Sequence, residues 1–593
     1  GTSVILPENN VSNLSTGYTP IQDSVAEFSV ITNALAAEYG RTGGGVINVA
    51  TRGGSNSLHF SAYDFLRNTK LDTNTWLNNR NGVKLAAFQR NQFGFTVGGP
   101  LTLPKIYNGH DKTFFFFNLE QFRETQHVNS NSVTVPVANY RAGNFSQALT
   151  GRNLGNDILN RAVPENGIYD PATQRTAPGG QLVRDLFPGN IIPTVRLDPV
   201  SLKVQSLIPQ PTGAGLSLNG IYPFDTDRFT YIPATKIDHS INTKAKLTFY
   251  WSWTNTLARF SNTTGGAEGL PQPISTATGT FIDSHTERLS FDYSLTPTLL
   301  LHLGGGYQDI FLNAPPETTP YDVTAQLGLK GPFTPIAFPP MNGLCSTNPC
   351  SGQGGMNNMG SSGGSNSIMQ KPTAVANLTW VRSNHTYKFG ASVTVGGFPQ
   401  WNNTNTQGTY TFSAAQTGLP YLNQTTLGGG NVGFPYASFL LGLVNNGNIA
   451  VPTSTRLGKT QTGIYAQDSW KVTRKFTLDY GIRYDYSQAQ REQYGRLPNL
   501  SPTTPDPAAG GQPGTAIYEA TCNCVFTKNY KLAFAPRLGA AYQINNKTVF
   551  RAGFGIMYNG TDNNNRTTGS VGSSNPFSTS AFGQPVMTFA GGV

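Results

Sequence analysis

The chain has 593 residues and a formal net charge of +10, yet Asp, Glu, Lys and Arg together make up only 12% of it. Soluble domains usually have about 25% charged residues, and the 11% aromatic content argues against a disordered chain. The basic residues are scattered singly, so the clustered basic surface of a nucleic-acid-binding protein is missing and we expect no nucleic-acid partner.

No apolar segment is long enough for a transmembrane helix. The longest apolar run, residues 437–444, is interrupted by Ser438 and Gly442, whereas a membrane-spanning helix needs roughly 18–20 apolar residues. Insertion into a bilayer would therefore require a closed β-barrel, the other fold that pairs every backbone group in lipid. The chain begins at Gly1 without a signal peptide, so we expect an internal piece of a longer precursor.

Residues 25–55 are predicted to form a small unit of their own. The pattern indicates a short strand over 25–31, a short helical turn over 35–39 and a second strand over 46–52. The turn before the second strand contains three successive glycines, which accept positive φ at low cost. This unit does not share the pattern of the rest of the chain.

From about residue 58 onward, apolar and polar residues alternate strictly in long segments. The clearest are residues 246–254, 288–295, 386–395, 476–486 and 550–558. Alternation predicts strands with one apolar and one polar face. We expect lengths of about 10 to 13 residues, which suit a tilted strand that crosses a bilayer. Lys, Arg and Asp on the polar face fit a water-filled lumen, and Tyr, Trp and Phe at the ends of the apolar face fit an interfacial girdle.

Short and long connections alternate between these strands. Tight turns are predicted near 241–243, 296–297, 383–384, 473–474 and 544–546, and long connections over 124–228, 257–279, 311–370, 398–459 and 489–528. Short periplasmic turns and long outer loops are typical of a transmembrane barrel. We therefore predict an all-β, antiparallel transmembrane β-barrel of roughly fourteen long strands, preceded by part of a small α/β domain.

The long loops are expected to be solvated over most of their length and to carry any ligand site. Residues 124–228 and the aromatic-bearing residues 410–436 are the places to look, because sugars and peptides favour aromatic platforms. The strand order also puts all four cysteines in outer loops, where an even number favours disulfides. We prefer a pair between Cys345 and Cys350, which leaves Cys522 with Cys524; other connectivities and a four-thiolate metal site are alternatives.

Several blocks of sequence resemble one known family. The opening unit carries Glu38-Tyr39-Gly40-Arg41 followed by Gly43-Gly44-Gly45-Val46-Ile47-Asn48-Val49. Further blocks follow in family order at 65–68, 90–94, 112–116, 169–173, 187–193, 465–471 and 536–539. Together they resemble TonB-dependent outer-membrane receptors, with the closest match to the Oar-like subfamily common in acidobacteria.

The resemblance implies a barrel of about 22 strands with a plugged lumen, in the outer membrane of a Gram-negative bacterium. Residues 1–56 would be the C-terminal part of the plug domain and residues 57–593 a barrel that is incomplete at its C-terminus, so we expect a fragment. The implied partners are outer-membrane lipid, an unknown ligand such as a glycan, peptide or metal chelate, and an inner-membrane TonB-type complex that pulls on the plug through a missing N-terminal segment.

One ion pair is predicted between plug and barrel. Arg41 follows the plug turn, and Glu120 shares a strand face with Phe116 and Asn118. If that face points inward, Arg41 and Glu120 could pair in a partly dry lumen, where charges interact more strongly than at a surface. Such a pair would latch the plug; the alternative is that Arg41 meets water or a backbone carbonyl.

The sequence offers no catalytic constellation. No histidines have metal-ligand spacing and no carboxylate pair stands out, so we expect no catalytic residues, no metal and no cofactor. The predicted function is therefore a transporter that binds a ligand with its outer loops and imports it through a plugged barrel. A secreted or surface β-rich adhesin without transport is the alternative, and a β-rich carbohydrate-active enzyme, which needs two close carboxylates, is a second one.

Overall fold

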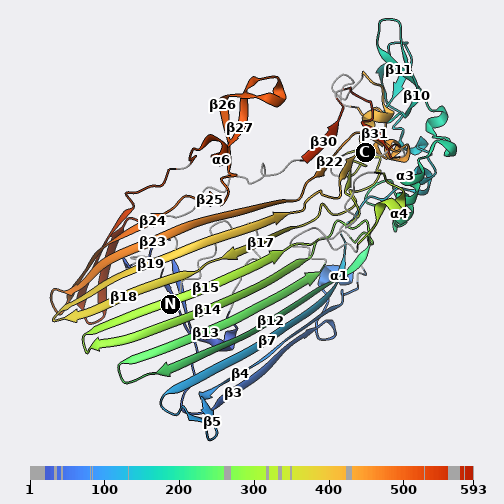
Figure 1. Cartoon of the computed structure of the whole chain (residues 1–593). Helices are drawn as coiled ribbons and strands as arrows, with labels where there is room; N and C mark the ends of the chain where they lie inside the picture. Colours follow the sequence, from blue (N-terminus) through green and yellow to red (C-terminus); the bar gives the residue numbers. More distant parts are fainter. Residues whose placement is uncertain are drawn as a thin grey trace.

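Most of the described chain forms one large antiparallel sheet that curves into a trough (Figure 1). The computed structural model describes residues 20–31, 36–41, 45–80, 82, 84–130, 132–259, 269–315, 320–330, 337–347, 350–421, 430–526, 528–558, 574–579, 581–589 and 591. The sheet has 15 strands, and its neighbours follow chain order. This is the all-β antiparallel architecture that the alternating pattern predicts.

We call this sheet the wall. Its strands are β3 (His59–Asn68), β4 (Phe88–Pro100), β7 (Thr113–Asn129), β12 (Pro223–Ser240), β13 (Ala245–Arg259), β14 (Thr280–Thr296), β15 (Leu299–Asn313), β17 (Ser365–Gln370), β18 (Thr373–Arg382), β19 (His385–Asn402), β23 (Thr453–Lys471), β24 (Phe476–Ser487), β25 (Arg491–Glu492), β28 (Phe534–Asn545) and β29 (Thr548–Gly555). The main path ends at β3 on one side and β29 on the other.

The two faces of the wall differ as the sequence predicts. On β24, Tyr480 and Ile482 are 41% and 48% exposed, whereas Arg483 and Asp485 on the other face are 3% and 4% exposed. The exposed face is the one that would meet lipid, and the polar face lines the lumen. Near the short turns, the Trp380 and Tyr387 rings lie 5.5 Å apart on the lipid-facing side, as an interfacial girdle would.

Several strands are longer than the predicted 10 to 13 residues. β12 and β19 have 18 residues each and β23 has 19. The sequence prediction ended these strands too early because backbone pairing continues toward the long loops after the apolar side chains stop alternating. The short turns fall where they were predicted, for example between β18 and β19 at Ser383 and Asn384.

The opening unit is a two-stranded antiparallel sheet beside the wall. It contains η1 (Gln22–Ser24), β1 (Val25–Ile31) and β2 (Val46–Thr51), with Phe28 opposite Val49. Both predicted strands are present. The predicted helical turn over 35–39 is only a hydrogen-bonded turn in its described part, where the Tyr39 N–H donates to the Ala36 carbonyl. We call the described parts of residues 20–54 the plug segment, after the sequence prediction; the assignment to a plug domain stays a prediction.

The long loops, except for the connection between β25 and β28, pack together at the end of the wall opposite the short turns (Figure 1). We call this region the cap; it comprises the described parts of residues 132–222, 269–279, 320–364, 403–452 and 574–591. Its elements are α2 (Ala138–Arg141), η3 (Ser146–Ala148), β8 (Asn153–Asn156), β9 (Ala162–Pro164), β10 (Tyr169–Thr176), β11 (Leu182–Leu186), η4 (Pro188–Asn190), η5 (Thr194–Arg196), α3 (Pro199–Leu207), α4 (Val323–Leu327), β16 (Met341–Asn342), β20 (Thr409–Thr411), η6 (Ala414–Thr417), α5 (Pro435–Leu440), β21 (Leu443–Val444), β22 (Asn446–Ala450), β30 (Ser574–Ser578) and β31 (Met587–Thr588).

The cap has a hydrophobic core, and the prediction of mainly solvated loops is corrected here. Thirty buried residues form one cluster that extends from Val133 to Phe589. Even the Gly- and Ser-rich stretch of residues 351–367 contributes Met356 and Met359, both fully buried. Glycine-rich composition predicts turns, but it does not show whether scattered apolar residues from distant loops meet.

The remaining short elements lie in the connections between wall strands. They are η2 (Thr69–Leu71), α1 (Trp76–Arg80), β5 (Thr102–Leu103), β6 (Tyr107–Asn108), β26 (Pro498–Asp506), η7 (Pro507–Ala509), β27 (Gln512–Tyr518) and α6 (Glu519–Cys522). None of the helices in the described part of the chain has the length and apolar composition needed to cross a membrane.

Candidate functional site

Residues 36–41 of the plug segment contact the lumen side of three adjacent strands, β19, β23 and β24. The Ala37 N–H donates to Gln467 Oε1 of β23 at 2.7 Å, and Ala37 is fully buried. The three strands are neighbours in the sheet. One sector of the wall therefore holds this turn of the plug.

An arginine–aspartate pair on β24 forms the centre of that contact. Arg483 and Asp485 are two residues apart, so both point into the lumen. Arg483 Nε donates to Asp485 Oδ1 at 2.7 Å, and each side chain is 3% exposed. Arg483 Nη1 also donates to the carbonyl oxygens of Ala37 at 3.3 Å and Glu38 at 3.4 Å. Because the aspartate balances the buried charge, the guanidinium can bind plug carbonyls without a second anion.

At position 40 of the plug motif there is no room for any side chain. A Cβ on Gly40 would lie 2.6 Å from Asp485 Oδ2 and closer still to the Arg483 guanidinium. On the wall side, Gly463 of β23 faces the same pair, and its Cβ would lie 3.0 Å from Asp485 Oδ1. Two glycines thus give the charged pair room between plug and wall.

The other residues of the plug motif make polar contacts around this centre. Glu38 Oε1 accepts a hydrogen bond from Lys388 Nζ of β19 at 2.9 Å, with both side chains about one third exposed. Tyr39 Oη accepts from Asn48 Nδ2 at 3.5 Å, within the plug segment. Gly45 has a φ of 151°, so it needs glycine for its backbone. Gly43 and Gly44 lie outside the described residues.

The structure does not bring Arg41 and Glu120 together. Arg41 Nη1 donates to Gln461 Oε1 of β23 at 3.3 Å, and Glu120 of β7 accepts from Tyr63 Oη at 2.6 Å. Glu120 does face the lumen, buried beside Asn118, as the alternation predicted. Between β23 and β7 lie six other positions of the sheet. Alternation therefore gave the face of the strand but not its place around the wall.

The end of the plug segment makes a second, separate contact with the wall. Lys236 Nζ of β12 donates to the Thr51 carbonyl at 3.1 Å. The same ammonium lies 3.7 Å from Asp238 Oδ2, and Lys246 Nζ lies 3.0 Å from the other carboxylate oxygen, Asp238 Oδ1. At the start of the segment, Ser61 Oγ of β3 donates to Asp23 Oδ2 at 2.9 Å. All of these contacts are polar.

In the cap, a buried arginine joins three distant segments. Arg184 of β11 is fully buried, and all of its described hydrogen-bond acceptors are neutral. It donates to Gln174 Oε1 of β10, to the carbonyls of Gln416 and Gly418, and to the Gly583 carbonyl at 2.7 Å. Burial lowers the pKa of Arg184 to about 10. The cationic side chain fixes the β10–β11 hairpin against two other loops.

The aromatic residues expected to form a ligand platform are buried instead. Tyr410, Phe434 and Tyr436 have no exposed area and belong to the cap core. The Tyr436 hydroxyl donates to Gln205 Oε1 at 2.8 Å, and burial raises its pKa. Residues 410–436 are therefore a packing element in their described part. An aromatic residue in a long loop does not by itself predict exposure, because the loop can fold onto its neighbours.

The cysteines lie in pairs outside the membrane-facing strands. Cys345 is bonded to Cys350 and Cys522 to Cys524, with Cα–Cα distances of 5.3 and 5.1 Å. Over the part of the chain that the structure describes, no group of three or more His, Cys, Asp or Glu side chains could hold a metal ion.

The sequence matches the model of the family described as outer membrane beta barrel domain over residues 50–592. The chain belongs to this family. Its place is accordingly the outer membrane of a Gram-negative bacterium, with the exposed face of the wall in lipid. No protein with a curated description matches the sequence.

Three solved structures are similar to the chain at low identity. The outer membrane transporter YddB of Escherichia coli is 13% identical, with a TM-score of 0.44 over 89% of this chain and 48% of its own. A mutant of the ferric enterobactin receptor of Pseudomonas aeruginosa is 11% identical, with a TM-score of 0.40 over 90% of this chain and 49% of its own. The copper transporter OprC is 9% identical, with a TM-score of 0.42 over 90% of this chain and 50% of its own. The chain spans about half the length of these proteins.

Proposed function

We propose that this chain is part of a TonB-dependent-type outer-membrane transporter of the Oar-like kind. In this proposal residues 1–56 are the end of the plug domain and residues 57–593 part of the barrel. The cap binds a ligand, and an inner-membrane complex pulls the plug so that the ligand enters. The chemistry is transport alone, without a catalytic step or a cofactor.

The observation that carries the proposal is the polar nature of the plug contact. Residues 36–41 are held by hydrogen bonds from β19, β23 and β24 and by the Glu38–Lys388 ion pair, while apolar side chains of the plug strands stay exposed; Phe28 and Ile47 are each 69% exposed. A contact made of a few polar bonds can break one bond at a time and form again. A plug held by a dry apolar core would resist such displacement.

The test is uptake by Gram-negative cells that carry the full-length protein. Four radiolabelled probes cover the candidate ligand classes: a ferric siderophore, cobalamin, a maltooligosaccharide and an oligopeptide. We expect one probe to accumulate in the periplasm, and only while the proton-motive force is maintained. Dissipating that force should leave surface binding and stop accumulation.

A reversible cross-link between the plug segment and β19 tests whether uptake requires residues 36–41 to move. In the variant Glu38→Cys/Lys388→Cys, a cleavable bismaleimide should stop accumulation, and cleavage of the linker should restore it. The single variant Glu38→Cys, treated in the same way, is the control. Surface binding of a probe without energised accumulation would contradict import and favour the adhesin alternative.

A further inference from the structure

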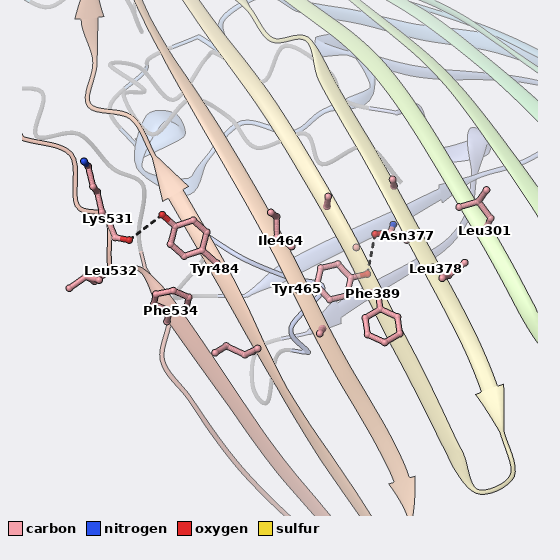
Figure 2. Close-up of a pocket in the computed structure, with 15 residues that line it drawn as sticks. Leu301, Asn377, Leu378, Phe389, Ile464, Tyr465, Tyr484, Lys531, Leu532 and Phe534 are labelled. Carbon is pink, nitrogen blue, oxygen red and sulfur yellow. Dashed lines mark hydrogen bonds between the residues drawn. The ribbon is translucent and has the colours of Figure 1, made fainter.

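The lipid-facing side of the wall contains an apolar groove of about 880 Å³ (Figure 2). It crosses β15, β18, β19, β23, β24 and β28. Its lining comprises Leu301, Leu378, Phe389, Ile464, Ile482 and Phe534, with three alanines among them. Asn377, Gly390 and Tyr465 also belong to the lining but lie, by alternation, on the lumen face, where the Tyr465 ring is 6.0 Å from the Arg483 guanidinium. The groove and the plug contact therefore lie on opposite faces of the same strands.

The strand register explains why the wall is hollow here. Ala376 of β18, Ala391 of β19 and Ile464 of β23 are consecutive partners in one row across the sheet. In the next row Phe389 is paired with Ala466. Small side chains in the middle of a wall of Leu, Ile and Phe leave a depression, because each missing side chain removes volume from the outer surface.

The groove runs obliquely from the side of the short turns to the side of the cap. Leu301 is the third residue of β15 after its short turn, whereas Tyr484 lies toward the opposite end of β24, where the long connection to β28 begins. Six strands at a spacing of about 4.8 Å give a length of about 24 Å. That length suits one long acyl chain of a membrane lipid.

A single cation lies at the cap end of the groove. Lys531 and Leu532 line that end, and the Tyr484 hydroxyl donates to the Lys531 carbonyl at 3.1 Å. Figure 2 shows the Lys531 amine extended beyond the Tyr484 ring, away from the groove floor. Lys531 forms no ion pair with any residue of the described ranges. The cap side is the outer leaflet, since long loops face outward in this class of barrel.

We propose that this groove binds one acyl chain of an outer-leaflet lipid whose anionic phosphate meets the Lys531 ammonium. Apolar burial alone would not select a lipid, because bulk lipid tails are as apolar as the wall. Selection comes from the shape of the alanine floor and from the charge at its end. The site is independent of transport, so it holds whether or not the protein imports a ligand.

The test counts bound lipids on the purified protein by native mass spectrometry. Dioleoyl phosphatidylglycerol, which is anionic, and dioleoyl phosphatidylcholine, which is zwitterionic, are added separately in dodecyl maltoside. We expect one tightly retained phosphatidylglycerol and about a fivefold preference over phosphatidylcholine, as one lysine near an anionic surface provides. Equal retention of the two lipids would overturn the proposal.

Two variants separate shape from charge. Lys531→Ala should abolish the preference and still retain one lipid of either kind, while Ala391→Phe should fill the floor and remove the retained lipid of both kinds. Lys547→Ala in a short turn and Ala62→Phe on the lipid-facing side of β3 are the matched controls and should behave as the unmodified protein. Unchanged retention in Ala391→Phe would refute the groove, and an unchanged preference in Lys531→Ala would refute the phosphate contact.

Discussion

The wall and the cap use the same aromatic residues in opposite ways. Phe554 on the wall is 68% exposed on the lipid-facing side, whereas Phe434 in the cap has no exposed area. The wall is held by backbone hydrogen bonds between strands that are neighbours in sequence. The cap is held by side chains from loops that are hundreds of residues apart. Stability is therefore local in the wall and long-range in the cap.

The largest expected effect comes from truncating a buried ring. Phe434→Ala should destabilise the cap by about 3–5 kcal/mol, since it removes a core ring and leaves a cavity. Hydrogen exchange of the cap amides measures this, and heat-modifiable gel mobility reports on the barrel. Phe554→Ala is the matched change on the wall and should leave both readouts nearly unchanged. Equal effects of the two variants would erase the contrast between wall and cap.

Removal of the buried cation should be the next largest effect. Arg184→Met leaves several buried acceptors without a donor and should cost the cap roughly 3 kcal/mol. Proteolysis of the cap under native conditions gives the measurement. Arg175→Met on the same hairpin is the control, because Arg175 forms its ion pair with Asp185 at the surface. If both variants are cleaved at the same rate, Arg184 does not link the segments.

On the lumen side of the wall, Gly40→Ala should displace the plug turn. The added methyl group meets the Arg483–Asp485 pair, and overpacking of this kind costs about 1–3 kcal/mol. The expected result is faster hydrogen exchange at Ala37, with the cap amides unaffected. Gly510→Ala is the control for steric overlap, because a Cβ at this loop position meets nothing within 4 Å. Its positive φ of 66° strains the local backbone, but this strain is remote from the plug turn. Slow exchange at Ala37 in the Gly40→Ala variant would show that the pair can move away.

The cap should also lose stability at high pH. Burial raises the pKa of Tyr140 and of Tyr436, so above the ordinary tyrosine pKa, about 10, the unfolded cap loses protons that the folded cap keeps. The stabilisation is complete below that pH and declines above it. Tyr436→Phe should flatten the decline in a thermal melt of the cap. Arg184, with its pKa lowered to about 10, changes stability in the opposite direction. Its contribution cancels when the unmodified protein and Tyr436→Phe are compared, because both contain Arg184.

The smallest effect is expected for the half-exposed ion pair of the plug. A double-mutant cycle with Glu38→Gln and Lys388→Met should give a coupling of about 0.5–1 kcal/mol, as for other solvent-accessible pairs. Exchange at the Ala37 amide is again the readout. A coupling of several kcal/mol would mean that this pair, rather than Arg483, dominates the plug contact.

The sequence predicted the wall well because its information is local. Alternation along residues 476–486 set both faces of β24, and the short turns set the order of neighbours. The parts of β12 and β23 next to the long loops were missed, since strand pairing there depends on the partner strand and not on apolar alternation. The cap was missed altogether: no local pattern shows that Tyr140, Phe434 and Phe589 meet in one core.

The plug contact was only partly predictable. The motif at residues 38–41 was found by resemblance, and its glycine is explained by a contact that the motif does not reveal. The partners Lys388 and Arg483 stand on polar faces that the alternation had identified, so their inward direction could be predicted, whereas Gln467 lies outside the alternating segments that were identified. Their position opposite the plug was not, because it depends on the curvature of the whole sheet. The same limit affected the expected Arg41–Glu120 pair.

The hydrogen bonds of Arg184 have a consequence for how the outer surface can diversify. Its acceptors come from the adjoining strand and from residues 416–418 and 583, so a graft of residues 169–186 from a relative would arrive without its own supporting carbonyls. If the cap binds a ligand as proposed, new preferences would arise by concerted change of several loops, or at loop tips that lie outside this network. Libraries that randomise such tips should yield more folded variants than libraries that exchange whole loops.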